Sequence, residues 1–202
     1  MPSFDDFCEQ DSPVDAPAAK PSPRIHPVIR GVSYIALGLF LGFLLRTFVI
    51  GSYVIPSGSM LPTLGIEDRI IGSKLAYASS EPERGDIVVF FSPEDGETRL
   101  IKRVVATAGQ TVSFDGGRLV VDGVVQSEPF AEGESEELSS HASTLDGPIE
   151  FPYTVPDGCV FVMGDNRMNS ADSRYFGAVP LSSIEAEAWF RYYPLDQVGA
   201  IG

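Results

Sequence analysis

Two residues that are far apart in the sequence, Ser59 and Lys102, have types and surroundings suited to act together as a nucleophile and its base. Ser59 lies in the segment VIPSGSMLPTL, where Pro56, Gly58 and Pro62 interrupt an otherwise extended run. A turn of this kind exposes a hydroxyl group and aims backbone N–H groups at one point. The same residues are also typical of an ST-turn, in which a serine hydroxyl bonds to the local backbone. The segment alone leaves both interpretations open.

A nucleophilic serine needs a base, and the usual base is histidine. The chain has two histidines, His26 in an N-terminal stretch rich in Pro, Asp and Ala, and His141 in a polar stretch with few large apolar residues. Neither setting would hold a histidine in a fixed geometry. A lysine or a carboxylate therefore remains as the base.

Two lysines follow the apolar segment of the chain, Lys74 and Lys102, and their surroundings differ. Lys74 precedes a polar loop, whereas Lys102 lies inside the apolar run RLIKRVVATAG. Strand alternation places Lys102 on the same face as Leu100 and Val104, which favours burial of its side chain. The alternative is an edge-strand lysine that pairs with a neighbouring acid.

Burial would make Lys102 a usable base. At the ordinary lysine pKa of about 10.4, roughly one side chain in 2500 is neutral at pH 7. Removal from water disfavours the ammonium form and lowers the pKa of a lysine by up to several units. The hypothesis of a Ser/Lys pair thus requires a buried lysine beside an exposed serine turn.

A third polar cluster is GDNRMNSADSRYFG, residues 164–177, directly after the apolar run CVFVM. We expect a stiff, hydrogen-bonded loop in which Asp172 and Arg174 form a charge-assisted pair and Ser170 holds the base. A surface loop of paired charges is the alternative. The triplet Arg84-Gly85-Asp86 is expected to form the turn before the next strand.

The segment 31–51, GVSYIALGLFLGFLLRTFVIG, is expected to cross a membrane. Its first 15 residues would span about 22 Å as a helix, and the full segment spans about 31 Å, close to the ~30 Å hydrocarbon core. Arg46 would lie near the far interface, where its side chain reaches the headgroups. A cleaved signal peptide would have its apolar core nearer the N-terminus, and a buried core helix would be amphipathic.

Positive charges flanking this span predict its orientation. Residues 1–30 form a tail rich in Pro, Asp and Ala that we expect to be disordered. Basic residues are more frequent before the span than after it, at Lys20, Arg24 and Arg30 against Arg46. The positive-inside rule then places the tail in the cytoplasm and residues 52–202 outside the membrane.

Residues 52–202 are expected to form one mostly β domain. Turn signals such as Asp122-Gly123 separate short runs rich in β-branched and aromatic residues. Residues 128–148 are expected to be an exposed, mobile insertion. The predicted strands are 87–91, 100–107, 111–114, 119–121 and 159–163.

Composition narrows the class of protein further. The chain has 202 residues, enough for one sizeable core, and its net charge of −14 with no Lys/Arg cluster argues against a nucleic-acid partner. Cys8 and Cys159 would be separated by the membrane span, which would forbid a disulfide between them.

Four segments, in this order after one apolar span, resemble the bacterial type I signal peptidases, Ser/Lys proteases that remove signal peptides from exported proteins. The segments are RTFVIGSYVIPSGSMLPTL, RGDIVVF, LIKRVVATAGQ and MGDNRMNSADSRYFGAVP. The similarity covers about residues 46–195. One such segment could arise by chance, whereas four in register are specific.

The resemblance implies roles for the residues singled out above. It implies Ser59 as the acylating nucleophile and Lys102 as the neutral general base. It places the hydroxyl of Ser57 and the backbone N–H of Ser59 in the oxyanion hole.

The polar loop would support the dyad. Ser170 is implied to orient Lys102, while Asp172 and Arg174 are implied to form the supporting ion pair. Met168 departs from the family pattern, in which an acid is usual at this position. The departure concerns a supporting contact rather than the dyad.

The resemblance also implies a fold, a substrate and a location. The expected catalytic domain is a mostly antiparallel β-sheet, tethered by one helix, with an apolar membrane-facing surface that includes Phe48, Tyr53 and Val54. Substrates would be signal-peptide-bearing preproteins with small residues at −1 and −3, processed without metal or cofactor at the plasma membrane of a bacterium, in contact with lipid. They would dock as an extended strand near Ile55, Pro56 and Ile101.

Two other functions share part of this pattern. A soluble Ser/Lys autoprotease related to stress-response repressors would need a DNA-binding domain and no span, which residues 1–51 do not suit. A tethered binding module without activity would keep the fold and lose the chemistry. Cleavage of a precursor separates this second alternative from the protease.

Overall fold

The computed structural model describes residues 27–138 and 149–201. Internal contacts divide the chain into two compact units, residues 1–40 and 41–202. The described strands all belong to the second unit, which also contains the residues expected to do chemistry.

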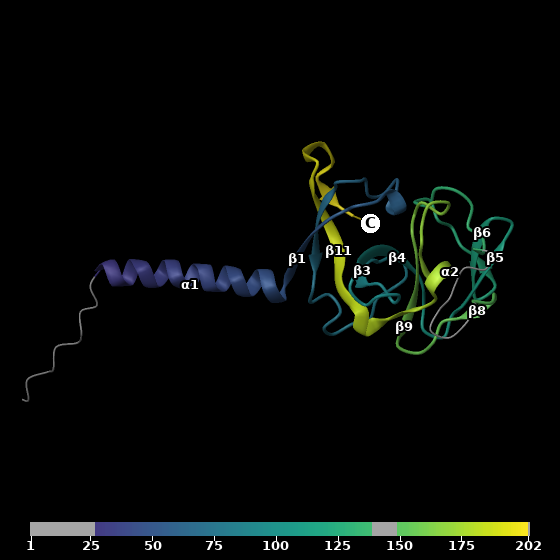
Figure 1. Ribbon diagram of the computed structural model, residues 1–202, viewed down its shortest axis with the longest axis horizontal. Coiled ribbons are helices and arrows are strands. Elements are labelled where there is room, and N and C mark those ends of the chain that lie inside the picture. The colour runs from purple at the N-terminus through teal and green to yellow at the C-terminus, as the bar shows by residue number, and fades with distance from the viewer. Residues whose placement is uncertain (1–26, 139–148, 202) are drawn as a thin grey trace, which may run out of the picture. The chain divides into compact units, whose positions relative to one another are not determined.

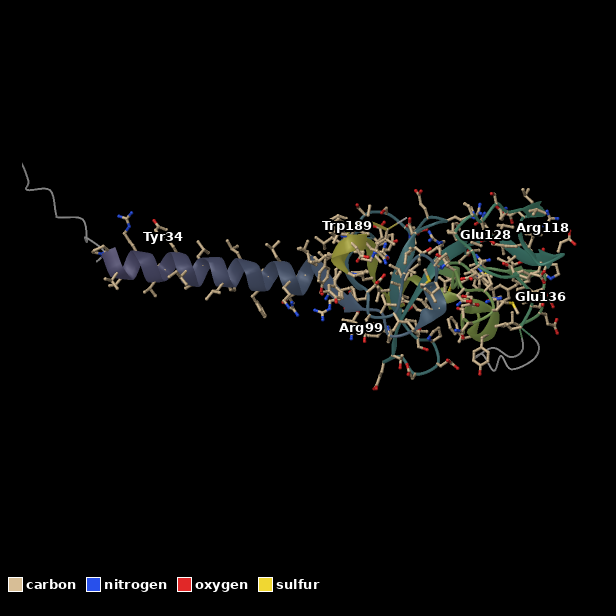
Figure 2. All side chains as sticks on the ribbon, turned by 90° about the horizontal axis from the view of Figure 1, so that it is seen from above. Tyr34, Arg99, Arg118, Glu128, Glu136 and Trp189 are labelled. Carbon is tan, nitrogen blue, oxygen red and sulfur yellow. The ribbon has the colours of Figure 1, made fainter. Side chains whose placement is uncertain are left out.

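Helix α1 (Pro27–Phe48) is the one helix among the described residues that is long and apolar enough to cross a membrane. Proline suits the first turn of a helix, where its missing N–H has no partner to lose. Apolar side chains extend from all sides of α1, Tyr34 among them, and none is buried (Figure 2). An unburied helix that is apolar all round is consistent with a membrane anchor.

The helix lies slightly earlier in the chain than the predicted span 31–51. It begins at Pro27 and ends at Phe48, and residues 50 and 51 already belong to strand β1 (Ile50–Val54). Pairing of β1 with β2 (Arg69–Ser73) supplies hydrogen bonds that a longer helix would have to give up.

The larger sheet of the described chain has eight strands, and each of its pairs is antiparallel. Its order is β1-β2-β11-β3-β4-β9-β10, with β12 added to β11, so that strands distant in sequence become neighbours (Figure 1). The strands not yet located are β3 (Ile87–Phe91), β4 (Arg99–Thr107), β9 (Cys159–Met163), β10 (Val179–Pro180), β11 (Ile184–Tyr193) and β12 (Gly199–Ala200).

A smaller antiparallel sheet, in the order β7-β6-β5-β8, covers the far end of β4 and β9. A cluster of buried side chains from both sheets, including Val105, Phe161 and Met163, joins them. Figure 1 shows β5, β6 and β8 on the side of the β domain opposite β1. The strands of this sheet are β5 (Thr111–Asp115), β6 (Arg118–Val121), β7 (Val124–Val125) and β8 (Tyr153–Thr154).

The five predicted strands are confirmed within one residue at each end, as β3, β4, β5, β6 and β9. The sequence analysis missed β2 and β11. The long strand β11 is interrupted by register shifts near Ala186, Trp189 and Tyr192, and its burial pattern lacks a clean alternation. Such irregular strands carry a weak period-2 signal.

The stretch 128–148, expected to be exposed, is tied down in the part that the structure describes. Glu128 forms a bidentate ion pair with Arg167, and Ser135 is buried beside the same guanidinium. Glu132 bonds through its backbone to residues 165 and 167. Residues 139–148, with His141, lie outside the described residues.

Two facing glycines make room for an aromatic ring at the start of the larger sheet. Gly51 of β1 pairs with Gly72 of β2, and the Tyr53 ring lies against both. A Cβ atom built on Gly51 would approach the Tyr53 ring and hydroxyl to 2.2–2.5 Å. The absence of these two side chains therefore sets the position of Tyr53.

We predict that Gly51→Ala will destabilise the protein by about 1–3 kcal/mol, because the tyrosine must leave its place or the strands must separate. The free energy of unfolding, measured with denaturant in detergent solution, tests this. Gly199→Ala is the matched control, since Gly199 is also a strand glycine but has no atom within 4 Å of its built Cβ. Equal stabilities of the two variants would contradict the prediction.

Candidate active site

Ser59 and Lys102 meet in the folded domain although 43 positions separate them in the sequence. The Lys102 Nζ atom lies 2.6 Å from the Ser59 Oγ atom, within hydrogen-bond distance. Both residues are buried, with 3% of Lys102 and 7% of Ser59 exposed. This geometry suits a nucleophile and its base.

Lys102 is buried because both faces of β4 are covered. Ile101 packs into one apolar cluster with Ile55 and Met60, whereas Val104 packs into another with Val88. Removal from water lowers the pKa of Lys102 from 10.5 to about 8, against the opposing effects of the Asp172 and Asp165 carboxylates. About one Lys102 side chain in ten is therefore neutral at pH 7.

Ser59 is held in a short 3₁₀ turn, Gly58–Met60. Met60 is fully buried, so the turn is anchored directly after the serine. Ser57 precedes the turn in an extended conformation, and its Oγ atom lies 3.4 Å from the Ser59 Oγ atom. This separation is long for a hydrogen bond between hydroxyls, so Ser57 is only weakly engaged.

Gly164 permits close packing of the polar loop on the serine turn. A Cβ atom at this position would lie 2.5 Å from the Ser59 carbonyl oxygen and 2.3 Å from the Ser170 Oγ atom. Ser170 thus lies next to the serine turn, whereas the sequence analysis expected it to hold Lys102. Its Oγ atom is buried and has no hydrogen-bond partner among the described residues, so no bond to Lys102 is formed.

Asp172 and Arg174 form the predicted ion pair, and it is buried. The Arg174 guanidinium donates two hydrogen bonds of 2.9 Å to the two Asp172 oxygens. Asp172 also accepts from the backbone N–H of Gly164 and caps the short helix α2 (Ser173–Phe176). Arg174 in turn donates to the backbone carbonyl of Arg167.

The sequence analysis did not predict two further buried ion pairs. Arg103, adjacent to Lys102, donates to both oxygens of Asp165 at 2.9 and 2.8 Å, and Thr63 donates to the same carboxylate. Arg167 pairs with Glu128. One signal was present, because an arginine inside an apolar strand must find an acid. The sequence could not say which acid.

A cleft with a volume of about 530 Å³ lies between β1 and β4, and its lining includes Ile101, the residue before Lys102. Among the described strands, β1 pairs only with β2, and β4 pairs with β9 only from Arg103 onward. Residues 99–102 therefore have one free edge, as does β1. Ile55, Pro56 and Ile101, the predicted substrate contacts, line this cleft.

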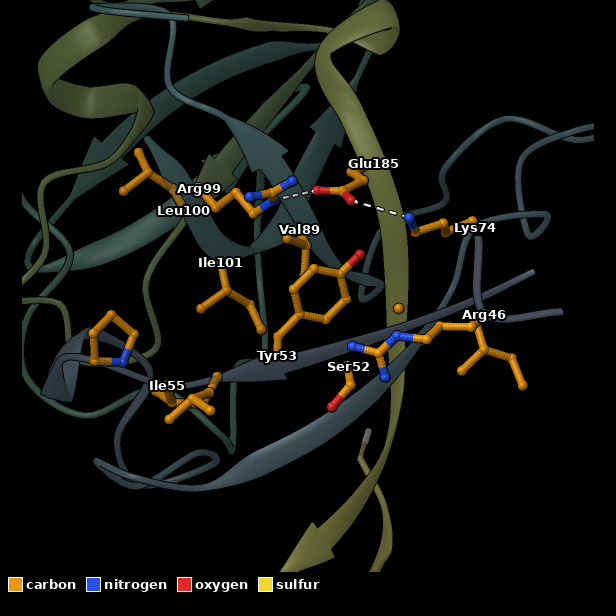
Figure 3. A pocket seen from close by; sticks show the side chains of 14 residues that line it. Arg46, Ser52, Tyr53, Ile55, Lys74, Val89, Arg99, Leu100, Ile101 and Glu185 are labelled. Atoms are coloured by element: carbon orange, nitrogen blue, oxygen red, sulfur yellow. Dashed lines mark hydrogen bonds and ion pairs between the residues drawn. The ribbon is translucent and has the colours of Figure 1, made fainter. Parts of the chain in front are cut away.

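The other end of the cleft is polar. Glu185 forms ion pairs with Arg99 and Lys74, and the Tyr53 hydroxyl points toward this cluster (Figure 3). Burial and the nearby Glu185 carboxylate raise the pKa of Tyr53 to about 12. Tyr53 thus lines the cleft instead of the outer surface expected for it.

No group of three His, Cys, Asp or Glu side chains in residues 27–138 and 149–201 is arranged to hold a metal ion. The Ser59 hydroxyl and the Lys102 amine are the reactive groups that the fold brings together. A serine hydroxyl beside a partly neutral lysine, at the end of a cleft with free strand edges, suits attack on the carbonyl of an extended peptide.

Comparison with known proteins agrees with this chemistry. The sequence profile of the family described as signal peptidase, peptidase S26, matches residues 28–193. The chain belongs to this family. Its relatives include proteins named signal peptidase I from Leptolyngbya laminosa, at 34% identity over 100% of this chain and 98% of the relative, and from Bacillus caldolyticus, at 35% over 76% and 85%. A probable signal peptidase I-1 from Synechocystis sp. is 39% identical over 85% of each chain.

Membership makes the chain a type I signal peptidase of mostly antiparallel β fold, a protease whose substrates are preproteins with signal peptides. Helix α1 is consistent with single-pass membrane anchoring. The predicted family and fold are both confirmed.

The buried Asp172–Arg174 pair leads to a prediction about stability. Asp172→Asn keeps the shape and the cap but leaves the Arg174 charge uncompensated, which should destabilise the protein by about 3–5 kcal/mol. Glu185→Gln is the comparison, because its partner Arg99 is half exposed and such a pair contributes at most about 1 kcal/mol. Denaturant unfolding should rank the two variants in this order, and the reverse ranking would contradict the analysis.

The lowered pKa of Lys102 predicts how stability depends on pH. Between about 8 and 10.5 the folded protein binds fewer protons than the unfolded chain, so the stability of the wild type should rise with pH by about 3 kcal/mol relative to Lys102→Met. Below pH 8 both states are protonated and the difference is constant. Unfolding free energies measured from pH 7 to 11 test this, and a flat difference would show that the lysine is not desolvated.

Proposed function

We propose that this chain is a membrane-bound serine endopeptidase that removes signal peptides through Ser59 and Lys102. The observation that supports it most directly is the 2.6 Å contact between the Lys102 Nζ atom and the Ser59 Oγ atom in a buried site. Family membership supplies the substrate class, and the dyad supplies the chemistry.

The reaction begins with transfer of the Ser59 hydroxyl proton to neutral Lys102. The Ser59 Oγ atom bonds to the scissile carbonyl carbon, and the carbonyl oxygen becomes an oxyanion. When the C–N bond breaks, the Lys102 ammonium returns the proton to the leaving amine, which leaves an ester on Ser59. Lys102 then takes a proton from a water molecule, whose oxygen attacks the ester, and the proton passes to Ser59 as the acid is released.

The oxyanion is stabilised by the backbone N–H of Ser59 and the hydroxyl of Ser57. The weak 3.4 Å contact of Ser57 with the Ser59 Oγ atom leaves its hydroxyl free to rotate toward the substrate. Ser170 supports Lys102 from the adjacent loop, which the Asp172–Arg174 pair stiffens. The Ser170 Oγ atom favours this role, because it is buried and has no hydrogen-bond partner among the described residues, and a buried hydroxyl is expected to have one.

The preprotein binds as an added strand between the free edges of β1 and β4, with small residues at −1 and −3 in the apolar half of the cleft. Ile55, Pro56 and Ile101 contact these residues. Ile55 and Ile101 pack into one apolar cluster with Met60 and Ile87, so this half of the cleft suits small apolar side chains.

The enzyme acts beside the plasma membrane of a bacterium, with the chain before Pro27 in the cytoplasm, the span within α1 (Pro27–Phe48), and the catalytic domain from β1 onward on the outer side. The distribution of Lys and Arg around the span supports this orientation. Exposed apolar side chains at the ends of neighbouring strands favour lipid contact, with Val54 59% and Leu195 82% exposed. Tyr193 and Val54 flank Arg69 across paired strands at this edge.

We predict that Ser59→Ala and Lys102→Ala each abolish cleavage of a preprotein with Ala at −1 and −3. The wild-type kcat/KM should rise with pH and reach half its maximum near pH 8, because only neutral Lys102 accepts the serine proton. Lys102→Arg should be inactive, since a guanidinium stays charged.

Ser113→Ala is the matched control, a serine replaced in the smaller sheet, and it should cleave at the wild-type rate. All variants are assayed as full chains in detergent or proteoliposomes. Cleavage by Lys102→Ala at the wild-type rate would rule out the dyad.

A further inference from the structure

Asn166 makes two hydrogen bonds to the serine turn. Its backbone N–H donates to the carbonyl of Ser59 at 3.1 Å, and its side-chain Nδ2 donates to the carbonyl of Gly58, also at 3.1 Å. One residue thus engages the carbonyls on both sides of the nucleophile. The sequence analysis assigned it no role.

The Gly58 carbonyl has a special relation to the nucleophile. It belongs to the same peptide unit as the N–H of Ser59, and a planar trans peptide directs its C=O and its N–H in opposite directions. Fixing the Gly58 oxygen therefore fixes the direction of the Ser59 N–H. A hydrogen bond to the oxygen also polarises the amide and strengthens its N–H as a donor.

The Ser59 N–H is free to serve a ligand. It lies at the start of a 3₁₀ turn, where the first N–H groups have no partner within the turn. The Gly58 oxygen already accepts from the N–H of Leu61 at 3.2 Å, which closes that turn. Asn166 adds a second donor from a different part of the chain.

Asn166 itself is rigidly held between two buried ion pairs. On one side Asp165 binds Arg103, and on the other Arg167 binds Glu128. The backbone of Glu132 bonds to both of these neighbours in a strand-like bridge. The carboxamide is thus preorganised, as a group that orients an active site must be.

We propose that Asn166 is a positioning residue for the oxyanion hole, acting through the Gly58–Ser59 peptide. It touches neither the substrate nor Lys102 in this role. The inference rests on the proposed function, because an oxyanion forms only if Ser59 attacks a carbonyl. Its effect belongs to the transition state, where the N–H of Ser59 meets developing negative charge.

Asn166→Ala and Asn166→Asp test the proposal in the full-length enzyme. Asp has nearly the same shape and keeps the backbone bond, but its carboxylate cannot donate to the Gly58 oxygen. Both variants should lower kcat by about 10- to 100-fold and leave KM within about twofold, since the lost interaction is made in the transition state. The midpoint of the pH profile should not move in Asn166→Ala, because this change adds no charge near Lys102.

Gln126→Ala is the matched control. Gln126 also donates from its carboxamide to a backbone carbonyl, that of Val124 at 2.7 Å, but in the smaller sheet. It should retain the wild-type kcat, which shows that removing such a bond does not by itself slow the reaction.

A peptide aldehyde with Ala at −1 and −3 gives a second measurement, because its adduct with Ser59 carries an oxyanion. Its affinity should fall by the same factor as kcat in both Asn166 variants. The affinity of a peptide amide with the same side chains should stay constant.

Three results would overturn the proposal: an unchanged kcat in Asn166→Asp, a loss carried by KM, or a shifted pH midpoint in Asn166→Ala. Loss of folding in both variants would make Asn166 structural and would also overturn it. Failure of the proposed function looks different, since the wild type would then cleave no faster than Ser59→Ala.

Discussion

Lys102 must be neutral to act as a base, and most of the surrounding structure serves that requirement. Its pKa falls because the side chain is removed from water, yet Asp165 and Asp172 are near enough to oppose the shift. Each of these carboxylates is bound in bidentate fashion by its own arginine. The guanidinium groups compensate the negative charge of the two carboxylates, which would otherwise stabilise the ammonium form of Lys102.

This arrangement explains why buried charge surrounds a site that needs an uncharged amine. Buried ion pairs add little net stability compared with apolar packing, so their value here lies in geometry and charge compensation. Three successive residues of β4 make different contacts. Ile101 lines the cleft, Lys102 meets Ser59, and Arg103 neutralises Asp165. Both faces of the strand are buried, which lets alternate side chains serve different purposes.

Close backbone approach is the second requirement, and glycines meet it. Gly164 lets the polar loop touch the carbonyl of Ser59, and through this contact the loop and the serine turn behave as one unit. Gly51 and Gly72 let the Tyr53 ring lie flat at the far end of the cleft. The cleft and the Ser59–Lys102 contact are therefore positioned by places where side chains are missing, which a list of functional groups does not reveal.

Much of this could be predicted from residue types and spacing alone. Four features were local patterns: an apolar segment of membrane length, five strands, a lysine in an apolar strand, and the segments shared with a protease family. Local patterns can be recognised without knowing which residues are in contact. The pairing of Asp172 with Arg174 was equally local, since only Ser173 lies between them. Strand β11 was missed because its register shifts and irregular burial weaken the period of two. Strand β2 buries alternate residues, but one of them is Gly72, which gives no apolar signal in the sequence.

Tertiary structure alone decided which distant groups meet. The order of strands that are far apart in the sequence determines which acids pair with Arg103 and Arg167. It also determines the second donor to the Gly58 carbonyl and the polar end of the cleft. The distance between the Lys102 amine and the Ser59 hydroxyl belongs here too. Sequence determined that a lysine and a serine of suitable character exist, because burial and turn propensity are properties of short segments. Only the folded sheet could bring them to 2.6 Å, because that distance is set by packing across 43 residues of chain.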